Sequence, residues 1–230
     1  RDYGFKINKC YDCARITSMH IGPDYWTAFT GEDRATIAKQ MHKSATGIIL
    51  MRTDGQMMYD ISADSCQTGL LLERNPDDNG ATAGYSNIAK LDIKDCYIGI
   101  RHKYNSASIS MANISTLGEG SIGILAEGTD TESTLRLYDC KITSKAACAW
   151  LGDTAKGTLA IQNSLLDGKG GKNAVLSYGG VLILTNNEFI GCEYAYAVSE
   201  NTLTAAITNN KFTGQYINQL DEKHSIVQTD

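Results

Sequence analysis

Short runs of alternating apolar and polar residues recur along the chain at a nearly constant interval. Residues 184–191 read LTNNEFIG, and 23 residues later residues 207–214 read ITNNKFTG, with five letters unchanged. The order apolar, any, apolar, any, any, Cys/Asn/Ser, any, apolar fits these phrases and earlier stretches of the chain. The stretches are 91–98, 135–142, 159–166, 182–189 and 205–212. A repeat of this length indicates a stacked architecture, because one unit cannot bury its apolar face alone.

A second strand pattern lies between the copies of the first. Each copy is a small residue followed by an apolar run, with successive starts 22 to 30 residues apart. The starts are Gly47, Gly69, Gly99, Gly123, Ala149 and Ala174, so that Trp150 is predicted to point inward. Alternation of period two dominates and helical periodicity is nearly absent. The pattern predicts an all-β fold, a single-stranded right-handed parallel β-helix (solenoid) of about eight or nine coils, its hand following the preference of parallel crossovers.

The repeated asparagines predict a ladder inside this solenoid. Asn187 and Asn210 occupy the same position of adjacent repeats, and Cys140 and Ser164 occupy it in earlier ones. A side-chain amide at an inward corner can bond the corner backbone and the amide of the next coil. We therefore expect Asn187 and Asn210 to be buried on adjacent coils.

Two segments depart from the strand pattern. Residues 32–45 are rich in helix formers, which predicts one short helix near residues 32–43, starting at Thr30 or Gly31 and packed on an outer corner of the first coils. Residues 73–87 are polar and rich in Gly and Asn, which predicts a loop of the kind that forms the wall of a binding groove on a solenoid.

Length and charge narrow the classes of partner. The chain has 230 residues and a net charge of −5, with no basic run and no apolar stretch near the ~18 residues that span a bilayer. Nucleic acid and membrane insertion are therefore not expected. Residues 1–230 are interpreted as one β-helix domain, and since a strand phrase begins at once at 3–7, as a fragment of a longer chain.

The cysteines favour buried thiols over disulfides or metal. Their number is seven, and an odd number argues against a complete disulfide framework. Cys66, Cys96 and Cys140 fall at similar corner positions and are expected to be free and to act as small hydrophobes. Cys10 and Cys13 form half of a zinc pattern without a second half. No metal and no cofactor are expected.

Two stretches carry a family resemblance. RITSMHIGPDYW (15–26) and SATGIILMRTDGQMMYDISADSCQTGLLLE (44–73) resemble the right-handed β-helix proteins of the pectate-lyase superfamily, and more narrowly domains similar to glycoside hydrolase family 55. The shared features are architectural: Gly-apolar strand starts, the RTDG turn and the Asn corners. Family 55 enzymes are exo-acting β-1,3-glucanases, so the resemblance implies a glycan ligand. No stretch here matches their catalytic motif, and no catalytic residue is carried over.

An outward row of side chains supplies candidate chemistry. The residues four positions after each strand start are Met51, Glu73, Lys103, Glu127, Asp153 and Tyr178. Stacking places Glu127 and Asp153 on adjacent coils, ~5 Å apart, a separation suited to paired carboxylates of a glycosidase. Glu127 and Asp153 are the predicted catalytic pair, and Glu73 is the reserve. The alternative is a solvated face, in which Lys103 only reduces repulsion between acids.

Aromatic residues indicate where a sugar would bind. Tyr25 and Trp26 follow a Gly-Pro turn near the first coils, and Tyr178 lies near the last coils. Aromatic rings have an apolar face that suits a half-wet surface. Trp26, Tyr25, Lys103 and Tyr178 are therefore the predicted glycan-binding residues.

Two functions follow from the sequence. The first is a secreted or cell-surface protein that hydrolyses or binds a polysaccharide resembling β-glucan; a lyase is disfavoured because no Lys/Arg cluster stands out. The second is a non-catalytic β-helix: an adhesin, a tail-spike-like stalk or a structural module. The expected partners are a polysaccharide or surface glycan, with further domains of the same chain or a homotrimer as open alternatives.

Overall fold

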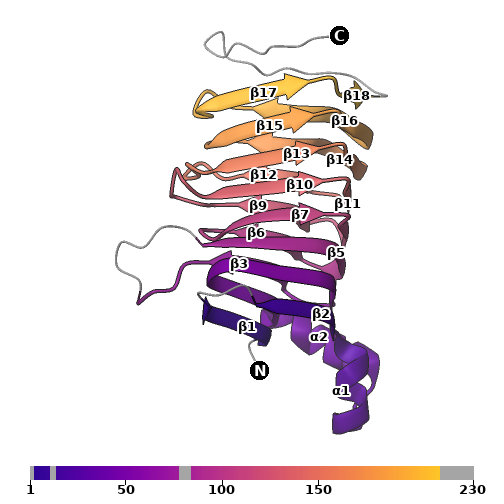
Figure 1. The fold of residues 1–230 in the computed structure, drawn as a ribbon. Helices are drawn as coiled ribbons and strands as arrows, with labels where there is room; N and C mark the ends of the chain where they lie inside the picture. The colour runs from indigo at the N-terminus through magenta and orange to yellow at the C-terminus, as the bar shows by residue number, and fades with distance from the viewer. Residues whose placement is uncertain (1–2, 11–13, 78–83, 213–230) are drawn as a thin grey trace.

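The chain forms a parallel β-solenoid of about 7 turns with two short helices near its N-terminus (Figure 1). The computed structural model describes residues 3–10, 14–77 and 84–212. The solenoid class is confirmed, and the turn number lies just below the eight or nine coils that the repeats suggested. Successive coils run along the stack from β1 to β17 and β18.

The element bounds are as follows. The helices are α1 (Pro23–Thr30) and α2 (Arg34–Ser44). The strands are β1 (Tyr3–Cys10), β2 (Arg15–Ile21), β3 (Thr46–Asp64), β4 (Thr68–Glu73), β5 (Tyr85–Cys96), β6 (Ile98–His102), β7 (Ser106–Ser110), β8 (Asn113–Thr116), β9 (Ile122–Ala126), β10 (Thr134–Tyr138), β11 (Lys141–Thr143), β12 (Ala147–Leu151), β13 (Thr158–Gln162), β14 (Leu165–Ser177), β15 (Val181–Thr185), β16 (Glu188–Val198), β17 (Thr204–Thr208) and β18 (Lys211–Phe212).

Strand pairing arranges each coil on three faces, which we call A, B and C in chain order. Face A contains β1, the start of β3, β4, β6, β9, β12 and the ends of β14 and β16. Face B contains the middle of β3, the start of β5, β7, β10, β13, β15 and β17. Face C contains the ends of β2, β3 and β5, then β8, β11, the starts of β14 and β16, and β18.

The corner between faces B and C repeats one backbone conformation. From β3 onward, one residue per coil has a left-handed φ between 50° and 59°: Asp60, Lys90, Met111, Asp139, Asn163, Asn186 and Asn209. Asn and Asp tolerate this region best among residues with a side chain. The residue that follows turns into the core, and this column, which we call the corner column, reads Ile61, Leu91, Ala112, Cys140, Ser164, Asn187 and Asn210.

The predicted asparagine ladder is present in this column. Asn187 is 1% exposed, and its Nδ2 donates to the Ile161 carbonyl at 2.8 Å and to Asn210 Oδ1 at 3.1 Å. Its Oδ1 accepts the Ser164 N–H at 3.0 Å. Asn210 Nδ2 donates to the Leu184 carbonyl at 2.9 Å. The prediction is confirmed for Asn187, which is buried, and for the placement of the two residues on adjacent coils. Asn210, in the last described coil, is half-buried and not fully buried as predicted.

The cysteines do not share one corner. Cys140 belongs to the corner column, where its N–H donates to Ser164 Oγ at 3.1 Å. Cys66 and Cys96 lie at the end of face C, and the Cys66 N–H donates to Cys96 Sγ at 3.4 Å. All three are buried free thiols, and burial raises the pKa of Cys140 to about 11. The prediction for Cys13 lies outside the described residues.

The helices differ in part from the prediction. The expected helix is α2, but it begins after Asp33, whose carboxylate accepts the Thr36 N–H at 2.9 Å, rather than at Thr30 or Gly31. Helix α1 was not predicted, because Gly22-Pro23 reads as a turn. Proline is also favoured in the first turn of a helix, where its missing N–H costs nothing. Neither helix of the described chain is long and apolar enough to cross a membrane.

The loop predicted over 73–87 connects β4 to β5 but is shorter than predicted, because Glu73 belongs to β4 and residues 85–87 belong to β5. Residues 78–83 lie outside the described residues. Its expected role as a groove wall therefore stays a prediction.

Candidate ligand-binding groove on face A

Backbone hydrogen bonds fix which residues share the outward row of face A. The Glu127 N–H donates to the His102 carbonyl, the Gly152 N–H to Ala126 and the Tyr178 N–H to Leu151. The row therefore contains Met51, Glu73, Lys103, Glu127, Gly152 and Tyr178. Met51, which was expected to be exposed like the rest of the row, is buried. Asp153 lies one residue beyond the row and is exposed. The residue predicted for the row is the one observed in every coil but that of β12, where Gly152 takes the place predicted for Asp153.

The shift corrects the prediction for Trp150. Ala149 pairs with Ile124, and Trp150 pairs with Leu125. The position equivalent to Gly123 is therefore Cys148 and not Ala149. Trp150 consequently points outward and is half-buried, where the sequence pattern had turned it into the core.

The two acidic residues of the row form ion pairs with basic side chains. Glu73 Oε2 accepts a hydrogen bond from Lys103 Nζ at 3.0 Å. Both oxygens of Glu127 accept from the Arg101 guanidinium, at 2.6 and 3.2 Å. The hydrogen bond that Arg101 donates to the Glu127 carboxylate raises the pKa of Arg101. Arg101 was missed by the sequence reasoning, because its row becomes visible only once the strand register is known.

Trp150, Tyr178, Glu127 and Asp153 line one shallow groove of about 430 Å³ on face A. Leu125, Gly152 and Thr154 complete the lining. The rings of Trp150 and Tyr178 have centroids 6.1 Å apart and planes tilted by 50°. Tyr178 is 41% exposed. We call this surface the Trp150 groove. It offers two aromatic rings and two carboxylates to a ligand.

The predicted catalytic residues are only partly brought together. Glu127 and Asp153 meet in the Trp150 groove, whereas Glu73 lies two coils away in its own ion pair with Lys103. The catalytic roles of all three stay predictions.

The predicted glycan-binding residues lie in three places. Tyr178 is in the Trp150 groove, and Lys103 is in the ion pair with Glu73. Tyr25 and Trp26 belong to α1 at the N-terminal end of the stack. Tyr25 is 56% exposed, and Trp26 lines a separate pocket described below.

A buried histidine–serine pair lies inside the solenoid rather than in a groove. His102 Nε2 is 2.7 Å from Ser133 Oγ, and both residues are buried. Burial lowers the pKa of His102 to about 4. The Ser133 hydroxyl also donates to the Tyr104 carbonyl. Since neither side chain reaches the surface, the pair is structural.

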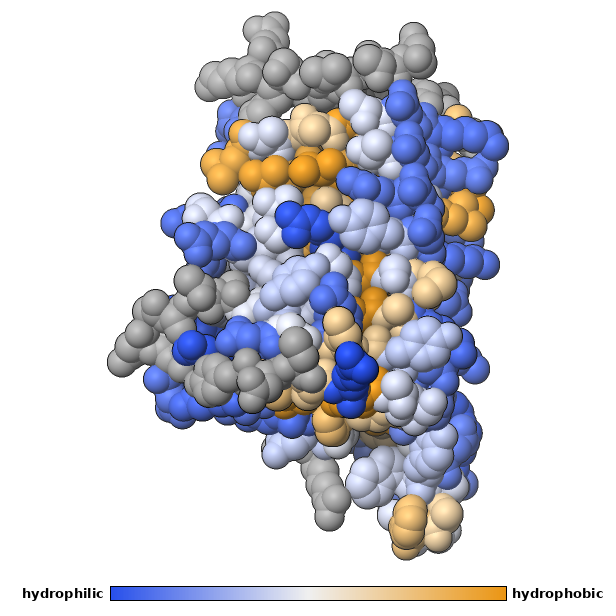
Figure 2. All heavy atoms as spheres, viewed as in Figure 1, coloured by the Kyte–Doolittle hydropathy of each residue, from blue (hydrophilic) through white to orange (hydrophobic). Residues whose placement is uncertain are grey.

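The surface seen in Figure 2 alternates hydrophilic and apolar residues, with an apolar band toward the C-terminal end of the stack. No group of three or more His, Cys, Asp or Glu side chains among the described residues is arranged to hold a metal ion.

No family model, no curated protein and no solved structure matches this chain.

Proposed function

We propose that the protein binds a polysaccharide in the Trp150 groove and does not cleave it. The observation that carries the proposal is the pair of outward aromatic rings, Trp150 and Tyr178, on adjacent coils beside Glu127 and Asp153. The resemblance of 15–26 and 44–73 to the pectate-lyase superfamily and to family 55-like domains supports a glycan as the ligand. A polysaccharide ligand supports the expected location outside the cell or at the cell surface.

The chemistry of the groove matches a neutral sugar. A pyranose ring has an apolar face, which packs against an aromatic ring, and hydroxyl groups at its edge, which donate to carboxylates. The rings provide the platform, and Asp153, which is exposed, provides acceptors at the rim. The parallel strands beneath keep the platform rigid, so that little ordering is needed on binding.

Binding is favoured over hydrolysis because of the ion pairs. Glycoside hydrolysis requires two carboxyl groups about 5–9.5 Å apart, one of them able to donate a proton. In the Trp150 groove Arg101 engages both oxygens of Glu127, and the reserve acid Glu73 is engaged by Lys103. This leaves Asp153 as the single carboxylate of the predicted set without an ion pair among the described residues.

The test is calorimetric titration with soluble β-1,3- and β-1,4-glucans. Trp150→Ala and Tyr178→Ala should each weaken binding at least tenfold. The control, Tyr59→Ala, removes an exposed ring from face B and should change affinity less than twofold. Equal affinities in all variants would refute the groove as the site.

Hydrolysis is the second candidate, because Glu127 and Asp153 do share the groove. Release of reducing ends from the same glucans separates the two functions. Activity that is lost in Glu127→Gln and Asp153→Asn would replace binding by catalysis as the function of this site.

A further inference from the structure

The first coil of the solenoid has strands that are paired along one edge only. β1 pairs with β3 from Tyr3 to Cys10, and β2 pairs with β3 from Arg15 to Ile21. No further strand of the described residues pairs with either of them, and both lie at the N-terminal end of the stack (Figure 1). The outer edges of residues 3–9 and 15–21 therefore offer backbone N–H and C=O groups to an added strand, each over ~23 Å at ~3.3 Å per residue.

The apolar side chains of this coil are less buried than their equivalents one coil further on. Five of them are half-buried although they pack against the core: Phe5, Ile7, Ile16, Met19 and Ile21. The residues of β3 that pair with them are at most 3% exposed: Ile48, Leu50, Met58, Ile61 and Ala63. The positions are equivalent, so the difference in burial arises because no described strand lies beyond the first coil. A strand added there would bury apolar surface as well as bond the backbone.

The charged side chains of the same coil are basic. Lys6, Lys9 and Arg15 are exposed, and none of them makes an ion pair with a described residue. Residues 3–10 and 14–21 contain no Asp or Glu, in a chain whose net charge is −5. Two copies of this edge would bring like charges together, which disfavours pairing of the protein with itself. The same charges attract an acidic strand.

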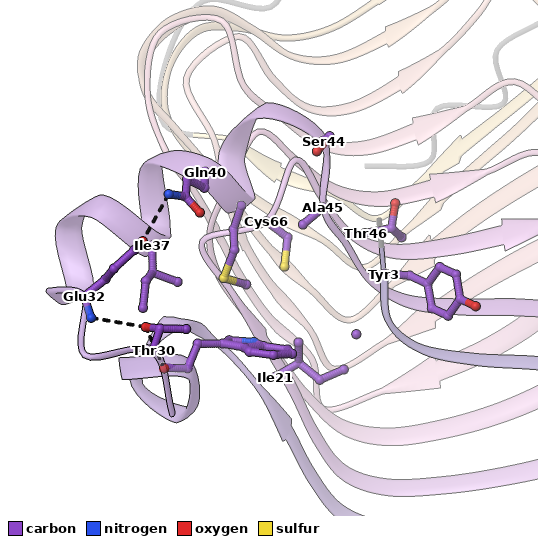
Figure 3. A pocket seen from close by; sticks show the side chains of 13 residues that line it. Tyr3, Ile21, Thr30, Glu32, Ile37, Gln40, Ser44, Ala45, Thr46 and Cys66 are labelled. Carbon is purple, nitrogen blue, oxygen red and sulfur yellow. Dashed lines mark hydrogen bonds between the residues drawn. The ribbon is translucent and has the colours of Figure 1, made fainter. Parts of the chain in front are cut away.

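A pocket of about 350 Å³ adjoins both edges, between the first coil and the helices (Figure 3). Its strand side includes Tyr3 and Ile21, and its helical side includes Trp26, Ile37 and Met41. The lining is largely apolar, and Tyr3 and Ile21 belong to β1 and β2 themselves. An apolar side chain at the end of an added strand can therefore enter this pocket.

We propose that this end of the solenoid binds an extended polypeptide segment of another protein, in which apolar and acidic residues alternate. The segment adds to the outer edge of β1 as a further strand, a recurring mode of peptide recognition. Because successive side chains of a strand point to opposite faces, its apolar side chains cover Phe5 and Ile7 while its carboxylates lie beside Lys6 and Lys9. The proposal does not depend on glycan binding, since the Trp150 groove is formed by other coils.

The test uses three end-blocked, fluorescein-labelled peptides with the sequences EVEIEVE, KVKIKVK and ESESESE. The first has the proposed pattern, the second reverses its charge, and the third keeps its charge without apolar side chains. We expect the fluorescence anisotropy of EVEIEVE to saturate with a Kd at least tenfold below those of the other two peptides. Because the net charge of the protein is −5, attraction by the molecule as a whole would favour the lysine peptide instead.

Two further measurements locate the site. Lys6→Glu should weaken binding of EVEIEVE at least fivefold, whereas the matched control Lys141→Glu, at an exposed position of β11, should change it less than twofold. Bound EVEIEVE should slow hydrogen exchange in residues 3–10 and 15–21 and leave β17 unchanged, as measured by mass spectrometry.

Equal affinities for the three peptides, equal effects of the two substitutions, or unchanged exchange in β1 and β2 would overturn the proposal. So would a dimer of the protein alone that Ile7→Lys dissociates, because a second copy would then occupy this edge.

Discussion

Replacing Asn187 by Leu tests whether the corner column is held by hydrogen bonds or only by packing. The substitution removes three side-chain hydrogen bonds, to Ser164, Ile161 and Asn210, from a site that is 1% exposed. Two backbone groups, the Ser164 N–H and the Ile161 carbonyl, lose a partner, at a cost of ~1–3 kcal/mol each. Burying the leucine side chain returns ~1.5–3 kcal/mol. Taking the middle of each range, a cost of about 4 kcal/mol against a return of about 2 kcal/mol, the expected net loss in the free energy of unfolding is about 2 kcal/mol.

The measurement is urea unfolding followed by both circular dichroism and tryptophan fluorescence. Coincidence of the two curves shows that a single transition is being compared, which solenoids do not guarantee. Asn113→Leu is the control: this asparagine is exposed on face C and makes one hydrogen bond, to Asp92 at 3.0 Å. Its effect should stay within about 0.5 kcal/mol, as for most surface substitutions. If Asn187→Leu costs no more than Asn113→Leu, the ladder does not stabilise the fold.

The remaining predictions concern charge and close packing. His102 has a pKa of about 4 in the folded state and ~6.5 when unfolded. Between these values the unfolded chain binds more protons than the folded chain. The free energy of unfolding should therefore fall by about 3 kcal/mol as the pH drops from ~6.5 to 4. Unfolding curves at pH 7, 5.5 and 4 measure this fall, and His102→Gln should flatten the pH dependence. Gly123→Ala places a Cβ 2.5 Å from the Cys148 carbonyl oxygen and 2.6 Å from Ile142 Cγ2. It should lower the thermal midpoint, with a cost of ~1–3 kcal/mol, whereas Gly118→Ala meets nothing within 4 Å and should not. A Gly123→Ala variant as stable as Gly118→Ala would show that the predicted clash relaxes without cost.

The solenoid could be predicted from the sequence, but the exact register of one coil could not. Strand starts were assigned to small residues, and Ala147, Cys148 and Ala149 are all small and all buried. Any of the three satisfies the pattern. The choice is made by the neighbouring coils, where Ala149 pairs with Ile124 and with Val175. This contact between distant segments decides whether Trp150 lies in the core or in a groove.

The ion pair of Arg101 with Glu127 escaped prediction for the same reason, whereas Lys103 had been placed between the acids of the row as one alternative. Arg101 and Glu127 are 26 residues apart and two positions out of step along their strands. Alternation indicates that both face outward, and only stacking shows that the guanidinium reaches the next coil. Of the predicted pair, Glu127 has a cationic partner once the coils are in register, whereas Asp153 makes no ion pair among the described residues.

The corner column explains why the repeat is easy to see in one part of the chain and faint in another. From Ile61 to Asn210, each residue of the column follows a residue with left-handed φ and points inward. In the first coils the slot is filled by Ile61, Leu91 and Ala112, where any apolar side chain of fitting size suffices. From Ser164 onward the slot must accept an N–H from the coil before, and Asn187 must in addition donate to a carbonyl and to the next amide. Only a short side chain with both a donor and an acceptor meets these demands. The structure thus repeats throughout, while asparagine repeats in this slot only in the last coils, where the side chain both accepts an N–H and donates to a carbonyl.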